Sequence, residues 1–259
     1  MKLNHDRRGN GEPLVLIHGI GGELEVWGGV VDRLAAEREV IALDLPGFGL
    51  SAVLPPGESA DAPGLARAVD AFLEDLGVGT VDVAGHSLGG WVVLELAKLG
   101  RARSVAALCP GGFFTPAERA WAKTFLRLSA WSARRYGERL APRWESPRTR
   151  TLLLGGSFGH PDRLPPEAAR RITAALAAGP GWKQTLDATA RQRFTGGEQV
   201  KVPVTLVWGT RDRLLWPRQA KRAQRAIPGA ELVWLRGAGH FVQWDEPERV
   251  AEVLLGLGR

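Results

Sequence analysis

The fold is decided by the stretch Val81-Asp82-Val83-Ala84-Gly85-His86-Ser87-Leu88-Gly89-Gly90. An apolar run ends at Ala84 and a helical apolar pattern begins at Leu88, so a serine stands at a strand-to-helix turn. Gly85 and Gly89, two residues before and after Ser87, remove side chains that would collide across such a turn. The turn places the Ser87 hydroxyl at a helix N-terminus, where the helix dipole favours developing negative charge. The pattern predicts Ser87 as a nucleophile.

A serine hydroxyl needs a base, and the base needs a carboxylate that orients it. His240 stands in a glycine-rich loop that follows a late apolar run, so we expect it at the carboxyl end of a strand. Asp212 follows the apolar run Val204–Trp208 in the same way. An earlier strand ends at Cys109, and no carboxylate follows it. The order Ser87, Asp212, His240 therefore predicts a catalytic triad.

Acyl transfer also needs donors aimed at the developing oxyanion. The loop His18-Gly19-Ile20-Gly21-Gly22 follows the first clear apolar run, and its glycines let backbone N–H groups face a cavity. We expect the backbone N–H groups of Ile20 and Leu88 to form the oxyanion hole. For His18 we expect a structural role in holding this loop.

Short apolar runs alternate with helical patterns along most of the chain. Most of the runs are continuous, as in strands covered on both faces of a parallel sheet. The predicted strands are 14–17, 40–43, 81–84, 105–108, 204–208 and 232–235, and helical patterns cover 66–76 and 88–99. This alternation predicts an α/β fold with a doubly wound, mostly parallel sheet.

The alternation stops between Cys109 and Val202, where about ninety residues contain no evident strand. This segment opens on Thr115-Pro116-Ala117-Glu118, a capping box with proline at the first helical position. We expect an α/β core made of residues 1–112 and 199–259, and a helical cap made of residues 113–198.

These motifs together resemble the α/β-hydrolase-fold serine hydrolases. The resemblance rests on His18-Gly19, Asp44-Leu45-Pro46-Gly47-Phe48-Gly49-Leu50-Ser51, Gly85-His86-Ser87-Leu88-Gly89-Gly90, Gly209-Thr210-Arg211-Asp212 and Gly239-His240-Phe241. It implies a helical cap inserted after the sixth strand of the family. It also implies that the short N-terminal segment 3–9 corresponds to the family's second strand, so that the usual first strand is absent and an edge is left open for pairing or dimerisation.

The resemblance implies a carboxylesterase-like hydrolase acting on small or medium acyl esters. It leaves open a thioesterase or esterase acting on carrier-bound acyl groups, a lactonase, a carbon–carbon hydrolase and a cofactor-free haloperoxidase. A ligand-binding protein that keeps the fold without turnover is the non-enzymatic alternative. Aromatic side chains are candidates for the wall of an apolar substrate pocket, with burial in the core as the alternative. They are Trp27, Phe48, Trp91, Trp121, Trp131 and Phe241.

The formal net charge of +6 is concentrated in the expected cap, where residues 113–198 hold 15 Lys and Arg against 7 Asp and Glu. One interpretation is a solvated helical face. The other is a docking surface for an acidic carrier protein, formed by Arg127, Arg134, Arg135, Arg139 and Arg143.

Several classes of function are disfavoured by the sequence. One cysteine in 259 residues excludes an intramolecular disulfide and a zinc–thiolate cluster. The run Gly47–Ala52 fits a dinucleotide-binding spacing but no helix start follows it, so we expect no cofactor and no metal. We also expect no nucleic acid partner, no membrane span and a cytoplasmic protein, and the oligomeric state is left open.

Overall fold

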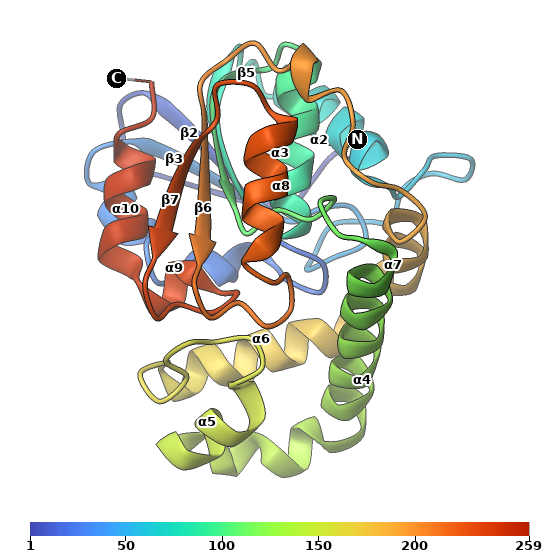
Figure 1. Ribbon diagram of the computed structural model, residues 1–259, viewed down its shortest axis with the longest axis vertical. Helices are drawn as coiled ribbons and strands as arrows, with labels where there is room; N and C mark the ends of the chain where they lie inside the picture. The colour runs from blue at the N-terminus through green and yellow to red at the C-terminus, as the bar shows by residue number, and fades with distance from the viewer. Residues whose placement is uncertain (259) are drawn as a thin grey trace.

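A computed structural model describes residues 1–258 of the chain (Figure 1). Its centre is a sheet in which only the first strand is antiparallel to its neighbour. The strands are β1 (His5–Arg8), β2 (Pro13–Ile17), β3 (Glu39–Leu43), β4 (Val81–His86), β5 (Ala102–Leu108), β6 (Val204–Gly209) and β7 (Glu231–Leu235). Their spatial order is β1-β3-β2-β4-β5-β6-β7. The predicted class, an α/β fold with a mostly parallel sheet, is confirmed.

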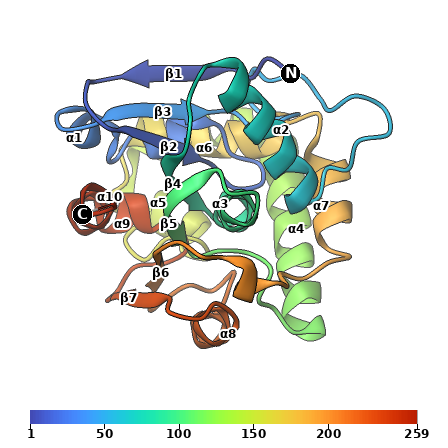
Figure 2. The ribbon, with the colours of Figure 1, turned by 90° about the horizontal axis from the view of Figure 1, so that it is seen from above.

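Helices cover both faces of this sheet (Figure 2). One face carries α2 (Ala62–Asp75), α3 (Leu88–Lys98) and α8 (Arg218–Ala226), and the other carries α1 (Val31–Ala35) and α10 (Pro247–Leu255). Every residue of β4 is buried. A strand covered on both sides has no solvent face, and this is why its sequence is mainly apolar rather than alternating. Its one acidic residue, Asp82, forms ion pairs with Arg38 and Arg103.

The N-terminal strand β1 forms one edge of the sheet and runs antiparallel to β3, with His5 opposite Leu43. No strand lies outside β1 within residues 1–258. The sheet therefore has seven strands, and the segment that resembles the family's second strand is its edge. Pairing or dimerisation through this edge stays a prediction.

The inserted helical region lies between β5 and β6 and sits below the carboxyl ends of the strands (Figure 1). It contains α4 (Pro116–Leu140), η2 (Ala141–Glu145), α5 (Pro147–Leu154), α6 (Pro166–Ala178), α7 (Trp182–Thr189) and η3 (Gly197–Gln199). Two short elements elsewhere, η1 (Leu24–Trp27) and α9 (Val242–Asp245), lie close to it in the loops of the sheet. We call α4 to α7 the cap.

The capping box at the start of α4 also attaches the cap to the sheet. The Thr115 hydroxyl accepts from the N–H of Glu118, and the Glu118 carboxylate accepts from the N–H of Thr115. The same carboxylate forms ion pairs with Arg218 and Arg222 of α8. Burial alone would raise the pKa of Glu118, but the hydrogen bonds from Arg222, Thr115 and Arg218 hold it at about 2. Glu118 therefore stays ionised and holds α4 against α8.

Among residues 1–258, no helix has both the length and the apolar character needed to cross a bilayer.

Candidate active site

Ser87 lies in the tight turn between β4 and α3 with φ 57° and ψ −112°, a strained conformation for a residue with a side chain. A methyl group at Gly85 would collide with the backbone of Gly89, and one at Gly89 would collide with the backbone of Ile17. The two glycines thus let β4, α3 and the end of β2 approach closely. This close approach presents Ser87 above the carboxyl ends of the strands.

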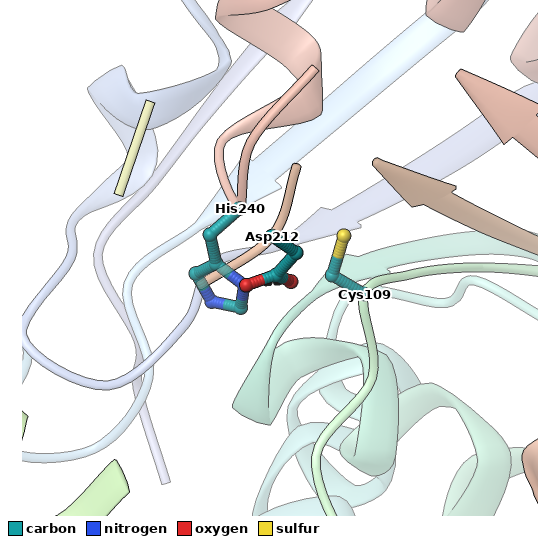
Figure 3. A group of neighbouring side chains, drawn as sticks. All are labelled: Cys109, Asp212 and His240. Atoms are coloured by element: carbon teal, nitrogen blue, oxygen red, sulfur yellow. Dashed lines mark hydrogen bonds and ion pairs between the residues drawn. The ribbon is translucent and has the colours of Figure 1, made fainter. Parts of the chain in front are cut away.

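Asp212 and His240 form a buried pair at the ends of two adjacent strands, β6 and β7 (Figure 3). The Nδ1 atom of His240 lies 2.8 Å from Oδ2 of Asp212. The other oxygen of Asp212 accepts from the N–H groups of Leu214 and Leu215 at 2.9 and 2.8 Å. Asp212 is therefore fixed as an acceptor, so Nδ1 of His240 carries the proton and Nε2 is left as an acceptor.

One cavity of about 770 Å³ unites the candidate residues, because both Ser87 and His240 line it. Within residues 1–258 the Ser87 hydroxyl makes no hydrogen bond, and no protein donor reaches Nε2 of His240. Both side chains line the cavity, and neither Oγ of Ser87 nor Nε2 of His240 is held by a hydrogen bond from the protein within residues 1–258. In unliganded hydrolases such contacts often tighten only when substrate binds.

The two N–H groups expected for the oxyanion hole are both without a protein acceptor. Within residues 1–258, neither the N–H of Ile20 nor that of Leu88 donates a hydrogen bond. A methyl group on Gly19 would lie 2.9 Å from Cβ of Ser87, so the loop that carries Ile20 passes directly beside the serine. Two free donors flank the hydroxyl, as stabilisation of a tetrahedral oxyanion requires.

The loop that carries Ile20 is held by buried polar residues. His18 bonds the Gly19 carbonyl oxygen through Nδ1 at 2.7 Å and accepts from the N–H of Leu45 through Nε2 at 2.9 Å. Burial lowers the pKa of His18, so its ring is neutral and serves as one donor and one acceptor. The carboxylate of Asp44 accepts from the N–H groups of Leu24 and Leu50. The segment beginning at Asp44 thus braces this loop.

Two residues that sequence reasoning did not assign also hold the site. His86 donates from Nε2 to the carbonyl oxygen of His240 at 2.9 Å. Burial, together with the neighbouring His240, lowers the pKa of His86 well below its ordinary value, so the ring is neutral. Asp245 accepts from the N–H groups of Gly239, Gly159 and His160 at 2.7 to 2.8 Å and so ties the His240 loop to the cap. Asp245 stands five residues after His240, and no local sequence motif marks an acid at that position as part of the site.

The aromatic residues expected at the pocket divide into two groups. Trp121 and Phe241 line the large cavity, and Trp91 lines an adjoining pocket of about 70 Å³ that Ser87 also borders. Trp27 and Phe48 are fully buried in the core, which is the alternative that the sequence left open for them, and Phe48 packs against the ring of His18. The side chain of Trp131 is exposed and lines neither space, so its place in a substrate pocket stays a prediction.

The cavity wall is mainly apolar on the side of the cap and charged near one edge. Phe125, Leu176 and Trp144 line it from the cap. At the charged edge, Glu25 lies 3.5 Å from Arg171 of α6 in an ion pair that joins core to cap. Burial, with smaller contributions from Glu25 and Asp44, raises the pKa of the nearby Glu23. An apolar substrate body with few polar groups fits such a space.

Cys109 lies beside the Asp212–His240 pair, and potential ligand atoms of these three residues lie within 4.8 Å of one another (Figure 3). The group does not suit a metal ion. Burial, together with the charge of Asp212, raises the pKa of the Cys109 thiol well above its ordinary value, so the thiol stays protonated. Both oxygens of Asp212 are already occupied by hydrogen bonds. The arrangement favours an oriented imidazole.

Residues 14–253 match the model of the alpha/beta hydrolase family. The chain belongs to this family of enzymes. The match runs from β2 almost to the end of α10, so it includes Ser87, Asp212 and His240.

Named relatives of the hydrolase include proteins of different activities. It is 31% identical over 253 residues to the dihydrolipoyllysine-residue acetyltransferase component of the acetoin cleaving system of Pseudomonas putida, covering 96% of this chain but 64% of that relative. It is 28% identical to haloalkane dehalogenase 2 of Mycobacterium tuberculosis, covering 98% of this chain and 90% of the relative.

Two solved structures show the same fold. An esterase from Thermogutta terrifontis superposes with a TM-score of 0.73 at 24% identity, covering 98% of this chain and 91% of the other. The enol-lactonase of Burkholderia xenovorans superposes with a TM-score of 0.77 at 22% identity, covering 98% and 95%. The likeness extends through the cap, and it concerns the fold alone.

Proposed function

We propose that this hydrolase cleaves carboxylic esters of small or medium acyl substrates through an acyl-enzyme formed on Ser87. The observation that supports the proposal most is the shared cavity. Ser87, in its strained turn, and His240, whose Nδ1 is 2.8 Å from Asp212, both line it. A nucleophile, its base and an open space for a carbonyl group thus occur together.

The mechanism follows from the hydrogen bonds. Asp212 accepts a hydrogen bond from the Nδ1–H group of His240, which keeps Nε2 unprotonated, so Nε2 takes the proton of Ser87 as Oγ attacks the ester carbonyl carbon. The N–H groups of Ile20 and Leu88 donate to the oxyanion of the tetrahedral intermediate. His240 then gives its proton to the leaving alkoxide, and the C–O bond breaks. Water attacks the acyl-enzyme by the same steps, which releases the acid and restores Ser87.

The two spaces beside Ser87 support a substrate with unequal sides. The cavity of about 770 Å³ accepts a bulky apolar group, whereas the pocket of about 70 Å³ next to Leu88 and Trp91 accepts only a few heavy atoms. We expect turnover to tolerate a large group on one side of the ester bond and to fall steeply as the other side lengthens. A panel of p-nitrophenyl and alkyl esters, varied separately in acyl and alcohol length, measures this.

The experiment that tests the function is Ser87→Ala on short p-nitrophenyl esters. We expect kcat/KM to fall by about 10⁴-fold or more. The Asp212→Asn substitution should lower kcat/KM by a similar factor. Ser59→Ala and Asp162→Asn are matched controls at exposed positions and should retain the parent rate. A Ser87→Ala protein that turns over the esters as fast as its parent would overturn the mechanism.

The same triad chemistry extends to lactones and thioesters, so these belong in the substrate panel. A haloalkane is included because one relative is named a haloalkane dehalogenase. We expect the carboxylic esters to give the highest kcat/KM. A protein that binds such compounds without converting any of them would point to the ligand-binding alternative.

A further inference from the structure

The outer end of the cap exposes large apolar side chains. They are Leu128, Trp131 and Tyr136 on α4 and Leu152 and Leu153 on α5, and we call these five the cap rim. Leu152 is 83% exposed and Leu128 is 60% exposed. In Figure 1 the end of α4 and the whole of α5 form the part of the cap farthest from the sheet. Apolar side chains gathered at one end of a molecule mark a binding surface.

The cap rim is continuous with the cavity. Leu128 and Leu153 line the cavity and are also exposed to solvent, Leu153 by 42%. The two helices approach one another here, because a methyl group on Gly156, just after α5, would come within 2.9 Å of the Phe125 ring of α4. Leu128 of α4 and Leu153 of α5 therefore border the cavity where it reaches solvent, and we call this border its mouth.

The segment that carries the cap rim is rich in positive charge. Residues 127–148 contain six arginines and two glutamates. Within residues 1–258, Arg135, Arg139, Arg143 and Arg148 form no ion pair. The side chains of the cap rim and these four arginines share the same short stretch of α4, η2 and α5.

The combination of exposed apolar side chains and unpaired arginines favours one kind of binding partner. A second copy of the chain would bring the same excess of arginines against itself, and like charges oppose that contact. An acidic carrier protein would also match the arginines, and it is the alternative that the variants below distinguish from a lipid surface. A membrane surface rich in anionic phospholipid matches both, because its headgroups attract arginine and its acyl boundary accepts Leu, Trp and Tyr side chains.

We propose that the cap rim and its four arginines bind the surface of an anionic phospholipid membrane, with the mouth of the cavity facing the headgroups. An ester dissolved in the membrane then passes from the lipid along Leu128 and Leu153 to Ser87. The use of such an ester rests on the proposed function, whereas the binding of lipid does not.

Vesicle flotation tests the binding. Large unilamellar vesicles of phosphatidylcholine alone are compared with vesicles of equal phosphatidylcholine and phosphatidylglycerol, at low and at physiological salt. Ser87→Ala protein is used so that no lipid is consumed. We expect binding to the phosphatidylglycerol vesicles, weakened by salt, and little binding to phosphatidylcholine alone.

The variants separate the cap rim from the rest of the surface. Trp131→Ala and Leu152→Ser, which do not line the cavity, should each weaken vesicle binding several-fold, and Arg135→Gln with Arg139→Gln should weaken it by roughly fivefold for each arginine. The matched control is Trp234→Ala on the edge strand β7, an exposed tryptophan that belongs neither to the cap nor to the lining of the cavity, which should bind like the parent. The same substitutions made in protein that keeps Ser87 should hydrolyse a dispersed short ester at the parent rate.

Three results would overturn the proposal. They are no binding to phosphatidylglycerol vesicles, equal weakening by Trp234→Ala and Trp131→Ala, or salt-sensitive binding to an acidic carrier protein that Trp131→Ala and Leu152→Ser leave unchanged. If the hydrolase function fails, vesicle binding by the Ser87→Ala protein should persist. If lipid binding fails, turnover of dispersed esters should persist.

Discussion

His86 donates a hydrogen bond from Nε2 to the carbonyl oxygen of His240 at 2.9 Å, so the residue next to the candidate nucleophile holds the loop of the candidate base. Their ring centroids lie 4.7 Å apart. Because both rings are buried, a proton on His86 would have no favourable partner, and this is why its pKa lies well below 6.5.

This pKa shift predicts how stability depends on pH. The folded pKa of His86 lies below the unfolded value of about 6.5, so below that pH the unfolded chain binds more protons. The free energy of unfolding should therefore fall as the pH drops from 7 to 5, with a slope of up to about 1.4 kcal/mol per pH unit for each such histidine. His18, shifted in the same direction, contributes likewise.

Denaturant unfolding at a series of pH values measures this slope. His86→Gln, which keeps a donor but takes up no proton, should show a shallower slope, and His5→Gln near the N-terminus serves as control. An unchanged slope in His86→Gln would contradict the assignment of a neutral buried ring.

Asp245→Asn should loosen the cap and slow turnover. Its carboxylate accepts three backbone N–H groups, two from the cap and one from the His240 loop, and an amide replaces one acceptor with a donor. We expect a loss of about 1.5–3 kcal/mol in the free energy of unfolding. We also expect a fall of about 10- to 100-fold in kcat, because His240 is displaced. Asp162→Asn, on an exposed side chain, should change neither quantity.

Gly21→Ala should lower kcat much more than it changes KM, because it disturbs the oxyanion hole. Gly21 has φ 71°, and a methyl group there would lie 2.6 Å from Cδ1 of Leu176 in α6. The neighbouring N–H of Ile20 would then shift away from the oxyanion. Loss of one such donor costs about 10²- to 10³-fold in kcat. Steady-state kinetics should show this fall with KM changed much less, and equal changes in kcat and KM would argue against the role of Ile20.

Cys109 offers a position from which a second carboxylate can reach His240. It directly follows β5 and lies next to Asp212, with its Sγ inside the 4.8 Å group, and aspartate tolerates its φ of 44°. Asp212→Asn should lose about 10⁴-fold in kcat. The double variant Asp212→Asn with Cys109→Asp should have a kcat about tenfold or more above that of Asp212→Asn alone, because a carboxylate again orients the imidazole. Cys109→Asn in the same background should recover nothing, and recovery by both would point to packing instead.

Much of the sheet could be predicted because each buried parallel strand is apolar at nearly every position. The apolar run at 81–84 lies within strand β4, Val81–His86. The run at 204–208 lies within strand β6, Val204–Gly209. Helix α8 was not predicted: its residues Arg218–Ala226 include few apolar ones, and it buries mainly alanines. The buried face of α8 consists of Gln219, Ala220 and Ala223, so no large apolar residues mark this helix in the sequence.

In the site, the residues on short local motifs were easier to predict than those defined by distant contacts. Ser87 and its two glycines lie within five residues, and the geometry of the turn requires all three. For Trp27 and Phe48 the sequence left both pocket and core open, because an aromatic residue in a loop gives no sign of which way it turns, and both are buried in the core. Asp245 was missed because its partners at Gly159 and His160 lie in the cap, about 85 residues away.

Covalent labelling of the serine tests the central claim most directly. Parent protein treated with a fluorophosphonate probe should gain one adduct by intact mass, and peptide mapping should place it on Ser87. His240→Ala should slow the labelling strongly, whereas the Trp234→Ala control should label at the parent rate. Ester turnover by a protein whose Ser87 stays unmodified, or inactivation through an adduct on another residue, would contradict the account.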